Sequence, residues 1–232
     1  MPDPDDGRRA RAGAAVGDAI VEIVSRVPAT RRTAVTDPER EMRRLARQAA
    51  RRAAVVSGGL SLPPGPLGML TLVPDLVAIW RIQSQLVADI AGLHGRSASL
   101  SREQMLYCLF RHAASQLLRD VVVRAGQRVV VHRLTSGAMR TLAARLGVQL
   151  SGQMVAKAAS RWVPGVGAAA VAAYAWWDTE RVARTAHELF SRDLVVDAQA
   201  VDVTDAPREA PEARPARGAA RRLRGGVDAP SP

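Results

Sequence analysis

The chain has few aromatic residues, one cysteine and one lysine among its 232 residues. Aromatic side chains make up only 3% of the sequence, so the apolar mass consists mainly of Ala, Val and Leu. Side chains of this kind suit close-packed helices better than sheets, which favour aromatic and β-branched residues. A single cysteine, Cys108, excludes an internal disulfide framework and a zinc site built from cysteines. The composition therefore predicts an all-α protein.

Arginine supplies nearly all of the basic charge. The formal net charge is +11 at pH 7, and Lys157 is the only lysine. Codon bias and selection for phosphate binding both produce such an excess, and composition alone does not separate them. The N-terminal residues are acidic and carry no apolar core of the secretory-signal type, which predicts a cytoplasmic protein. The lone thiol agrees with a reducing compartment.

The chain is expected to divide into a helical domain and two disordered ends. We place the disordered N-terminus at residues 1–13, the domain at 14–196, and a disordered tail rich in Arg, Pro and Ala at 197–232. The tail has no periodic apolar positions, so it cannot bury enough surface to offset its chain entropy. Its arginines are interpreted as solvated charges rather than as a contact to anionic lipid or nucleic acid.

Apolar positions recur at helical spacing along most of the domain. They predict helices over 14–27, 39–56, 75–93, 101–124, 127–146 and 148–161, with a last helix ending near residue 192. The residues expected to cap or stop these helices are Pro28, Asp37, Gly58, Gly59, Gly95, Gly147 and the capping box of Ser101 and Gln104. Val129–Val131 could instead form a short strand, because periodicity over so few residues does not decide.

Two uncharged runs, 53–74 and 162–177, stand out from this pattern. The first is long enough to cross a bilayer, for which about 20 residues are needed. Pro63, Pro64 and Pro66 lie within it and would remove backbone hydrogen bonds from a continuous helix. We therefore expect a kinked apolar turn, either in the core or dipping into a membrane. Both runs are predicted to lead into apolar helices at the centre of a helical bundle.

Candidate catalytic motifs each have a structural interpretation that fits better. Cys108 and His112 share one helix face, but a nucleophile and its base normally come from different elements, so Cys108 is interpreted as a small core residue. Residues 165–170 match the dinucleotide pattern GxGxxA without the preceding strand that such a site requires. The sequence also has no GxxxxGK[ST] phosphate loop, so no nucleotide cofactor is expected.

No metal site is expected either. None of the four histidines has a histidine partner at the spacing of a helical zinc site. The aspartates that would have to converge are far apart in the sequence and are interpreted as helix caps and ion-pair partners. These are Asp75, Asp89, Asp120 and Asp178. The chain is therefore interpreted as a protein without a cofactor, and an enzyme is not the favoured class.

Motifs in the two apolar segments resemble the EcsC family of bacterial proteins. The residues that carry the resemblance are Gly65–Gly68, Leu72–Leu76, the helix from Gln83 to Ala91 closing at His94–Gly95, and Trp162–Ala168 with Asp178 and Ala183. The similarity spans about residues 40 to 192. It implies a helical, membrane-associated protein whose activity is not established, and it supplies no catalytic residue.

We expect a non-catalytic protein that associates peripherally with the cytoplasmic face of the inner membrane, or with a membrane protein such as a transporter. Arginines beside an uncharged run suit a protein lying on an anionic membrane, although they also suit the surface of a soluble bundle. Nucleic acid is not the expected partner, since no stacking aromatics accompany the arginines. The expected contact residues are Arg43, Arg44, Arg47, Arg51, Arg52, Leu67, Leu70, Leu72 and Val73.

The alternative is an uncharacterised enzyme or small-ligand protein with a polar pocket. Arg81, Gln85 and Asp89 recur every fourth residue on one predicted helix face, and Asp75 begins the same helix. These four residues would line the pocket. The pattern predicts no particular ligand and no oligomeric state.

Overall fold

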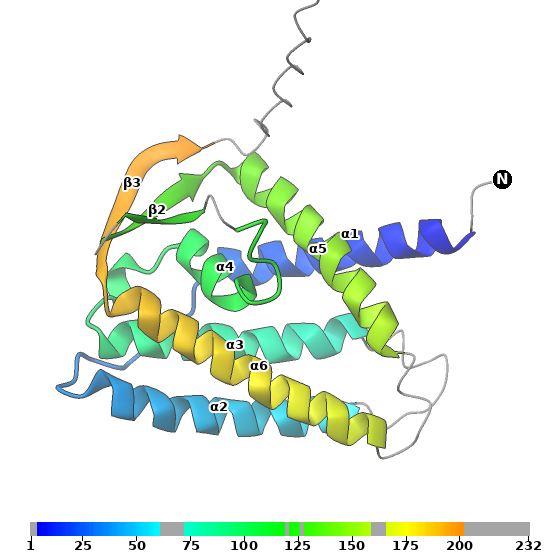
Figure 1. The fold of residues 1–232 in the computed structure, drawn as a ribbon, viewed down its shortest axis with the longest axis horizontal. Helices are drawn as coiled ribbons and strands as arrows, with labels where there is room; N and C mark the ends of the chain where they lie inside the picture. The colour runs from blue at the N-terminus through cyan, green and yellow to red at the C-terminus, as the bar shows by residue number, and fades with distance from the viewer. Residues whose placement is uncertain (1–3, 61–71, 119–120, 126–127, 159–165, 202–232) are drawn as a thin grey trace, which may run out of the picture.

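Helices account for most of the described chain, and the predicted all-α bundle is confirmed at the level of fold class. The computed structural model describes residues 4–60, 72–118, 121–125, 128–158 and 166–201 (Figure 1). The helices are α1 (Pro4–Ser25), α2 (Pro38–Leu60), α3 (Leu72–Leu93), α4 (Arg102–Phe110), α5 (Ser136–Ala158) and α6 (Val166–Phe190), with a 3-10 turn at Ser97–Ser99. Three short strands accompany them: β1 (Val122–Ala125), β2 (Arg128–Leu134) and β3 (Asp193–Val201).

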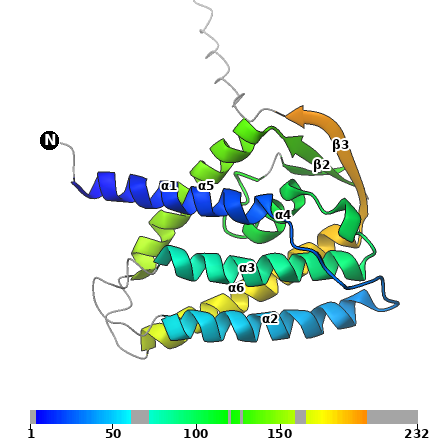
Figure 2. The same cartoon turned by 180° about the vertical axis from the view of Figure 1, so that it is seen from behind.

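The short helix α4 lies at the centre of the bundle. Every residue from Glu103 to Phe110 is buried. The helix α3 passes beside it, and the ring of Trp80 meets that of Phe110 edge to face with centroids 5.1 Å apart. On one side α2 packs against α6 and α3, and on the other α1 packs against α5 (Figures 1 and 2). The core is thus built from several helices around one buried helix.

A small mixed sheet covers one end of the bundle, where the sequence pattern predicted helix. The strand order is β1-β2-β3, with β1 antiparallel and β3 parallel to β2. Among the described residues, the predicted helices 101–124 and 127–146 are therefore wrong over 111–118, 121–124 and 128–135. Within β2, Val129 and Val131 are buried while Val130 is only partly buried, which is the alternation of a strand. The alternative of a strand at Val129–Val131 is the correct one.

A buried carboxylate ties this sheet to α4. Glu103 is 5% exposed, and its Oε1 accepts a hydrogen bond of 3.1 Å from the backbone N–H of Leu134, at the end of β2. The contact satisfies a backbone donor that would otherwise be buried without a partner. In the sequence, Glu103 is an acidic residue inside a capping box, a pattern that indicates a helix start and not a contact to a strand.

The helix α5 continues through Gly147, where a break was predicted. Its closest neighbour is α1: a Cβ placed on Gly147 would lie 2.7 Å from the backbone nitrogen of Gly17 and 3.1 Å from its Cα. A separation of 2.7 Å is shorter than real Cβ contacts allow. Gly147 is therefore a contact point between two helix backbones rather than a helix end.

Several predicted helix ends are confirmed and others move. The Asp37 carboxylate accepts from the backbone N–H of Arg40 at 3.0 Å, the capping box of Ser101 and Gln104 is formed, and Gly95 ends α3 with φ +68°. In contrast, α2 runs past Gly58 and Gly59 to Leu60, and α1 begins at Pro4, within the segment predicted as disordered. The strand β3 includes residues 197–201, which were assigned to the tail.

The two apolar segments can be compared with the prediction only in part. Residues 61–71 and 159–165, which contain the Pro/Gly entries, lie outside the described residues. The helix α3 that follows the first entry lies mostly in the core, as expected. By length and composition, residues Pro74–Leu93 are also long and apolar enough to cross a membrane, but most of this stretch is buried in the protein. The first half of α6, in contrast, is largely exposed over residues 169–174.

Candidate functional site

The predicted polar pocket on α3 turns out to be an attachment point for the segment between α1 and α2. The carboxylate of Asp89 accepts a 2.7 Å hydrogen bond from the hydroxyl of Thr30, and the Gln85 amide donates to the carbonyl oxygen of Ala29 at 3.2 Å and to Asp89 at 3.0 Å. Arg81 is exposed and lies 3.7 Å from Glu22 of α1. The hydrogen bonds to Ala29 and Thr30 hold the segment between α1 and α2 (residues 26–37) against α3. We call this segment the strap.

Asp75 does not belong to that group. It is 5% exposed, in the first turn of α3, whereas Gln85 and Asp89 contact the strap at the far half of the helix. The four residues proposed as a pocket therefore do not share one set of contacts. The structure instead brings together a different polar group, deeper in the core.

A buried network of hydrogen bonds joins α3, α6 and the turn after α4. Gln83 has no exposed surface, and its amide donates to Asp178 Oδ2 at 2.7 Å and to the Thr179 hydroxyl at 3.2 Å. His112 Nε2 donates to Asp178 Oδ1 at 2.5 Å, with the two side chains 10% and 13% exposed. Thr179 in turn donates to the carbonyl oxygen of Ala175 at 2.8 Å. Elements far apart in sequence meet at Asp178.

This network positions helices, and its two atoms without a hydrogen-bond partner lie inside the protein. The second ring nitrogen of His112 and the Oε1 of Gln83 are buried and have no hydrogen-bond partner in the described part of the chain. A general base must reach the proton that it removes, and these atoms are closed off from solvent. Gln83 is a polar residue within the predicted helix 75–93, and nothing in the sequence pattern indicates its partner.

The cysteine–histidine pair is likewise not a catalytic pair. Cys108 is fully buried, and burial raises the pKa of its thiol, with the nearby Arg111 charge acting weakly in the opposite direction. A thiol in such surroundings stays protonated and unreactive. Among the described residues, the His112 ring bonds to the Asp178 carboxylate and not to the thiol. The interpretation of Cys108 as a core residue agrees with this geometry.

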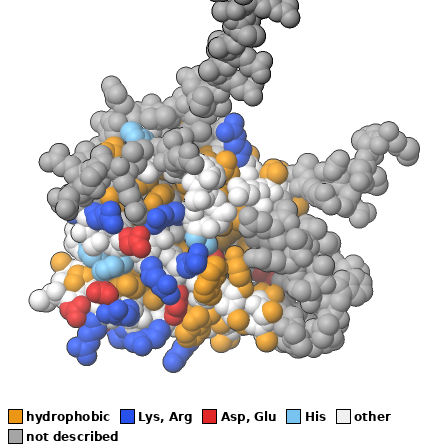
Figure 3. All heavy atoms as spheres, viewed as in Figure 1, with side chains coloured by type: hydrophobic (Ala, Val, Ile, Leu, Met, Phe, Trp, Pro, Cys, Tyr) orange, Lys and Arg blue, Asp and Glu red, His pale blue; other side chains and the backbone are white. Residues whose placement is uncertain are grey.

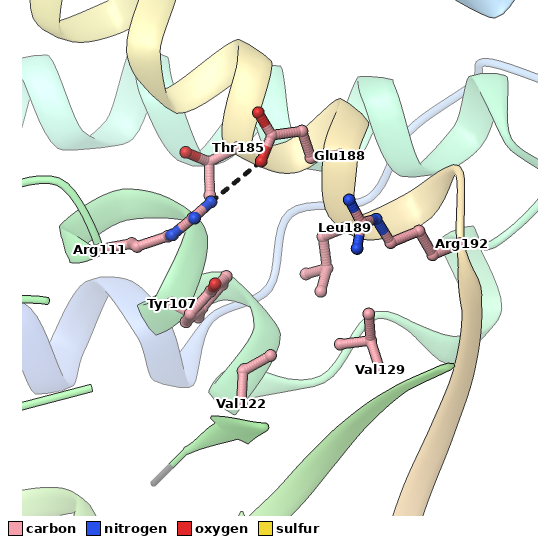
Figure 4. Close-up of a pocket in the computed structure, with 8 residues that line it drawn as sticks. All are labelled: Tyr107, Arg111, Val122, Val129, Thr185, Glu188, Leu189 and Arg192. Atoms are coloured by element: carbon pink, nitrogen blue, oxygen red, sulfur yellow. Dashed lines mark hydrogen bonds and ion pairs between the residues drawn. The ribbon is translucent and has the colours of Figure 1, made fainter. Parts of the chain in front are cut away.

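The cavity between α4, the sheet and the end of α6 is very small. It measures about 10 Å³, close to the space for one water molecule. Figure 4 shows Arg111 reaching across it to Glu188 at 3.1 Å, with Tyr107 below. Arg111 also lies over the Tyr107 ring, 5.5 Å from its centroid. The cavity is filled by these contacts and leaves no room for an organic ligand.

A larger groove, of about 410 Å³, lies between α2 and α6. Its floor includes Met42 and Ala46, and charged side chains of both signs stand on its walls. Two of the acidic residues pair along their own helices, Glu39 with Arg43 at 2.9 Å and Glu180 with Arg184 at 3.2 Å. Arg47 lines the same groove and has no ion-pair partner among the described residues.

One of the lining residues of this groove, His187, meets a second histidine, His94. His94 Nε2 and His187 Nδ1 are 3.2 Å apart, so one of the two nitrogens donates and the other accepts. Burial, then the neighbouring His187 and Arg96, lowers the pKa of His94. Within the described residues there is no group of three or more His, Cys, Asp or Glu side chains that could hold a metal ion. We therefore interpret the two rings as hydrogen-bond partners and not as metal ligands.

The predicted membrane-contact residues are only partly within the described structure. Arg43, Arg44, Arg47, Arg51 and Arg52 are all exposed on α2. Their opposite face is buried and consists of Met42, Leu45, Ala46, Ala49, Ala50 and Ala53. Leu67 and Leu70 lie outside the described residues; Leu72 and Val73 form the start of α3, and their side chains are not described. The arginine half of the predicted contact is thus a continuous helical surface.

Comparison of the chain with models of known protein families, with curated proteins and with solved structures finds no match in any of the three.

Proposed function

We propose that this protein is a non-catalytic helical protein that binds peripherally to an anionic membrane surface through the exposed arginine face of α2. The EcsC-like motifs agree with such a role. The proposal rests on one observation: α2 is amphipathic, with an apolar face in the core and an outer face dominated by arginine.

The state of these arginines supports an external anionic partner. Arg43 and Arg44 have intrahelical partners, Glu39 at 2.9 Å and Glu41 at 2.9 Å, both in the first part of the helix. Beyond them the acidic residues end, and Arg47, Arg51 and Arg52 have no ion pair with any part of the described chain. Their steps of four and one residues place them on neighbouring faces of the same helix. Lipid phosphates would supply the missing negative charge.

The strength expected from this surface is appreciable. Each basic residue near an anionic leaflet contributes about 1 kcal/mol, so three unpaired arginines correspond to an affinity change of roughly 100-fold. Because the contact is exposed, salt screens it over a distance of about 8 Å at physiological ionic strength. Binding should therefore weaken as salt is raised.

The test is sedimentation with vesicles of phosphatidylcholine alone or mixed with phosphatidylglycerol, at low and high salt. We expect binding only to the anionic vesicles, and a loss of at least about 100-fold when Arg47, Arg51 and Arg52 are changed to Glu. The matched control changes Arg133, Arg140 and Arg145 to Glu; these are exposed arginines on β2 and α5. Equal loss of binding in both variants would mean that net charge, and not the α2 surface, causes the binding. Absence of binding by the unmodified protein would refute the proposal.

A further inference from the structure

The first half of α6 exposes two of the chain's few aromatic side chains next to each other. Tyr174 is 42% and Trp177 45% exposed, and their ring centroids lie 5.9 Å apart. The other aromatic side chains near the core are largely covered: Trp80, Tyr107, Phe110 and Phe190 are all buried. We call the pair Tyr174 and Trp177 the aromatic ledge.

Exposed alanines and an arginine accompany the aromatic ledge on the outer side of α6, whereas the neighbouring Asp178 bonds inward to Gln83 and His112. Ala169, Ala170 and Ala173, which precede it on α6, are exposed. The guanidinium carbon of Arg181 stands over the Trp177 ring, 4.0 Å from its centroid. Stacking of this kind leaves the N–H groups at the guanidinium edge directed outward, where they can bind phosphate oxygens. Arg181 has no carboxylate partner among the described residues.

The helix that carries the aromatic ledge packs beside the arginine-bearing helix α2. The helices α2 and α6 pack side by side and run in opposite directions, so the start of α6 lies by the end of α2 (Figures 1 and 2). Near that end of α2, Val55 is 75% exposed, one turn after Arg51. Figure 3 shows arginine side chains beside a hydrophobic patch over these two helices.

From this arrangement we infer that Tyr174 and Trp177 insert into the headgroup–acyl boundary of an anionic phospholipid surface, while Arg181 and the arginines of α2 bind the phosphates. Tyr and Trp are enriched at membrane interfaces because one end of each side chain is apolar and the other polar. The inference rests on the proposed membrane function and names the face and the side chains that enter the lipid.

Charge argues against a second copy of the chain as the occupant. A symmetric dimer through this face would bring the same patch of each protomer together. A surface that carries Arg181 and the unpaired arginines of α2 would then face a second surface of the same charge, and like charges across an interface are destabilising. An anionic lipid surface supplies both the opposite charge for the arginines and an apolar layer for the two rings.

The test compares Tyr174→Ser/Trp177→Ser with Trp176→Phe on vesicles of phosphatidylcholine and phosphatidylglycerol. Trp176 is the matched control, since it adjoins the aromatic ledge, is half-buried, and its indole donates to Glu180 at 3.2 Å. We expect the double variant to lose at least about tenfold in affinity, because binding scales with the apolar area inserted, and to lose all binding at high salt. The control should bind as the unmodified protein does.

A second measurement does not depend on a drastic variant. Lipids with brominated chains quench only tryptophans that enter the acyl region, so quenching should fall in Trp177→Phe and persist in Trp176→Phe. Unchanged affinity of the double variant, or equal quenching in Trp177→Phe, would overturn the inference while leaving the arginine contact intact. A dimer in solution that the double variant converts to monomer would also overturn it. If the unmodified protein bound no anionic vesicle, the proposed function and this inference would fail together.

Discussion

Replacing Gly147 by alanine should destabilise the protein, although the same change raises helix propensity. The position lies inside α5, where Ala is favoured over Gly by about 1 kcal/mol. Against this gain stands the crossing of α5 with α1. The added Cβ would come within 2.7 Å of the Gly17 nitrogen and closer still to the carbonyl oxygen of Gly13.

The sign follows from what the new methyl group would touch. All three of its nearest neighbours are backbone atoms, of Gly13 and Gly17, so no side chain can rotate away and the helices must separate. The separation would disturb the packing of Val16, Ile20 and Val24, which are at most 1% exposed on α1. Forced overpacking costs about 1–3 kcal/mol, and contacts this short with backbone atoms place the cost near the upper end. After the helix-propensity gain of about 1 kcal/mol is subtracted, we expect a net loss of about 2 kcal/mol.

Thermal unfolding followed by circular dichroism measures this effect. For a protein of this size, a loss of about 2 kcal/mol lowers the Tm by roughly 4–8 °C. The matched control is Gly137→Ala in the first turn of α5, where the nearest atom to the new Cβ is the Thr135 hydroxyl at 3.9 Å. That variant should be as stable as the unmodified protein or more so. A Gly147→Ala protein with an unchanged or higher Tm would refute the close crossing.

Two further predictions concern buried polar groups. Asp178→Ala should lower the free energy of unfolding, measured by urea titration, by about 1–3 kcal/mol, because it leaves the His112 ring without its acceptor. The control Arg184→Ala breaks only an exposed ion pair with Glu180 and should cost under about 1 kcal/mol in the same titration. Stability should also fall on acidification: the folded-state pKa of His94 is lowered, so the unfolded chain takes up the proton first, and the penalty grows as the pH drops below about 6.5. A His94→Asn variant should show a flatter Tm profile between pH 8 and 5; an identical slope would contradict the assignment.

Local signals in the sequence best predicted the starts of α2 and α4. Asp37 and the capping box of Ser101 and Gln104 act within one turn of chain, so their partners are adjacent in sequence. The sheet could not be predicted in the same way. Val129 and Val131 form a strand because β3 pairs alongside them, and β3 lies more than 60 residues further on. Strand formation depends on such distant pairing more than on intrinsic preference.

The polar core shows the same limit. Gln83 is a polar residue within the predicted apolar helix 75–93, and Asp178 directly follows the uncharged run 162–177. Their hydrogen bond joins residues 95 positions apart, so only the packing of α3 against α6 makes it visible. Conversely, Arg81, Gln85 and Asp89 did lie along one helix, but regular spacing did not reveal that the strap segment covers two of them.

The orientation of α6 links the buried network to the proposed lipid contact. Asp178 and Trp177 are consecutive, and adjacent side chains on a helix point about 100° apart. Hydrogen bonds from Gln83 and His112 hold Asp178 inward, and Thr179 beside it is fully buried. With those two positions held inward, Tyr174, Trp177 and Arg181 stand on the outer side of the same helix. The polar cluster therefore acts together with the buried Val182, Leu189 and Phe190 further along α6 in fixing which side chains this helix presents outward.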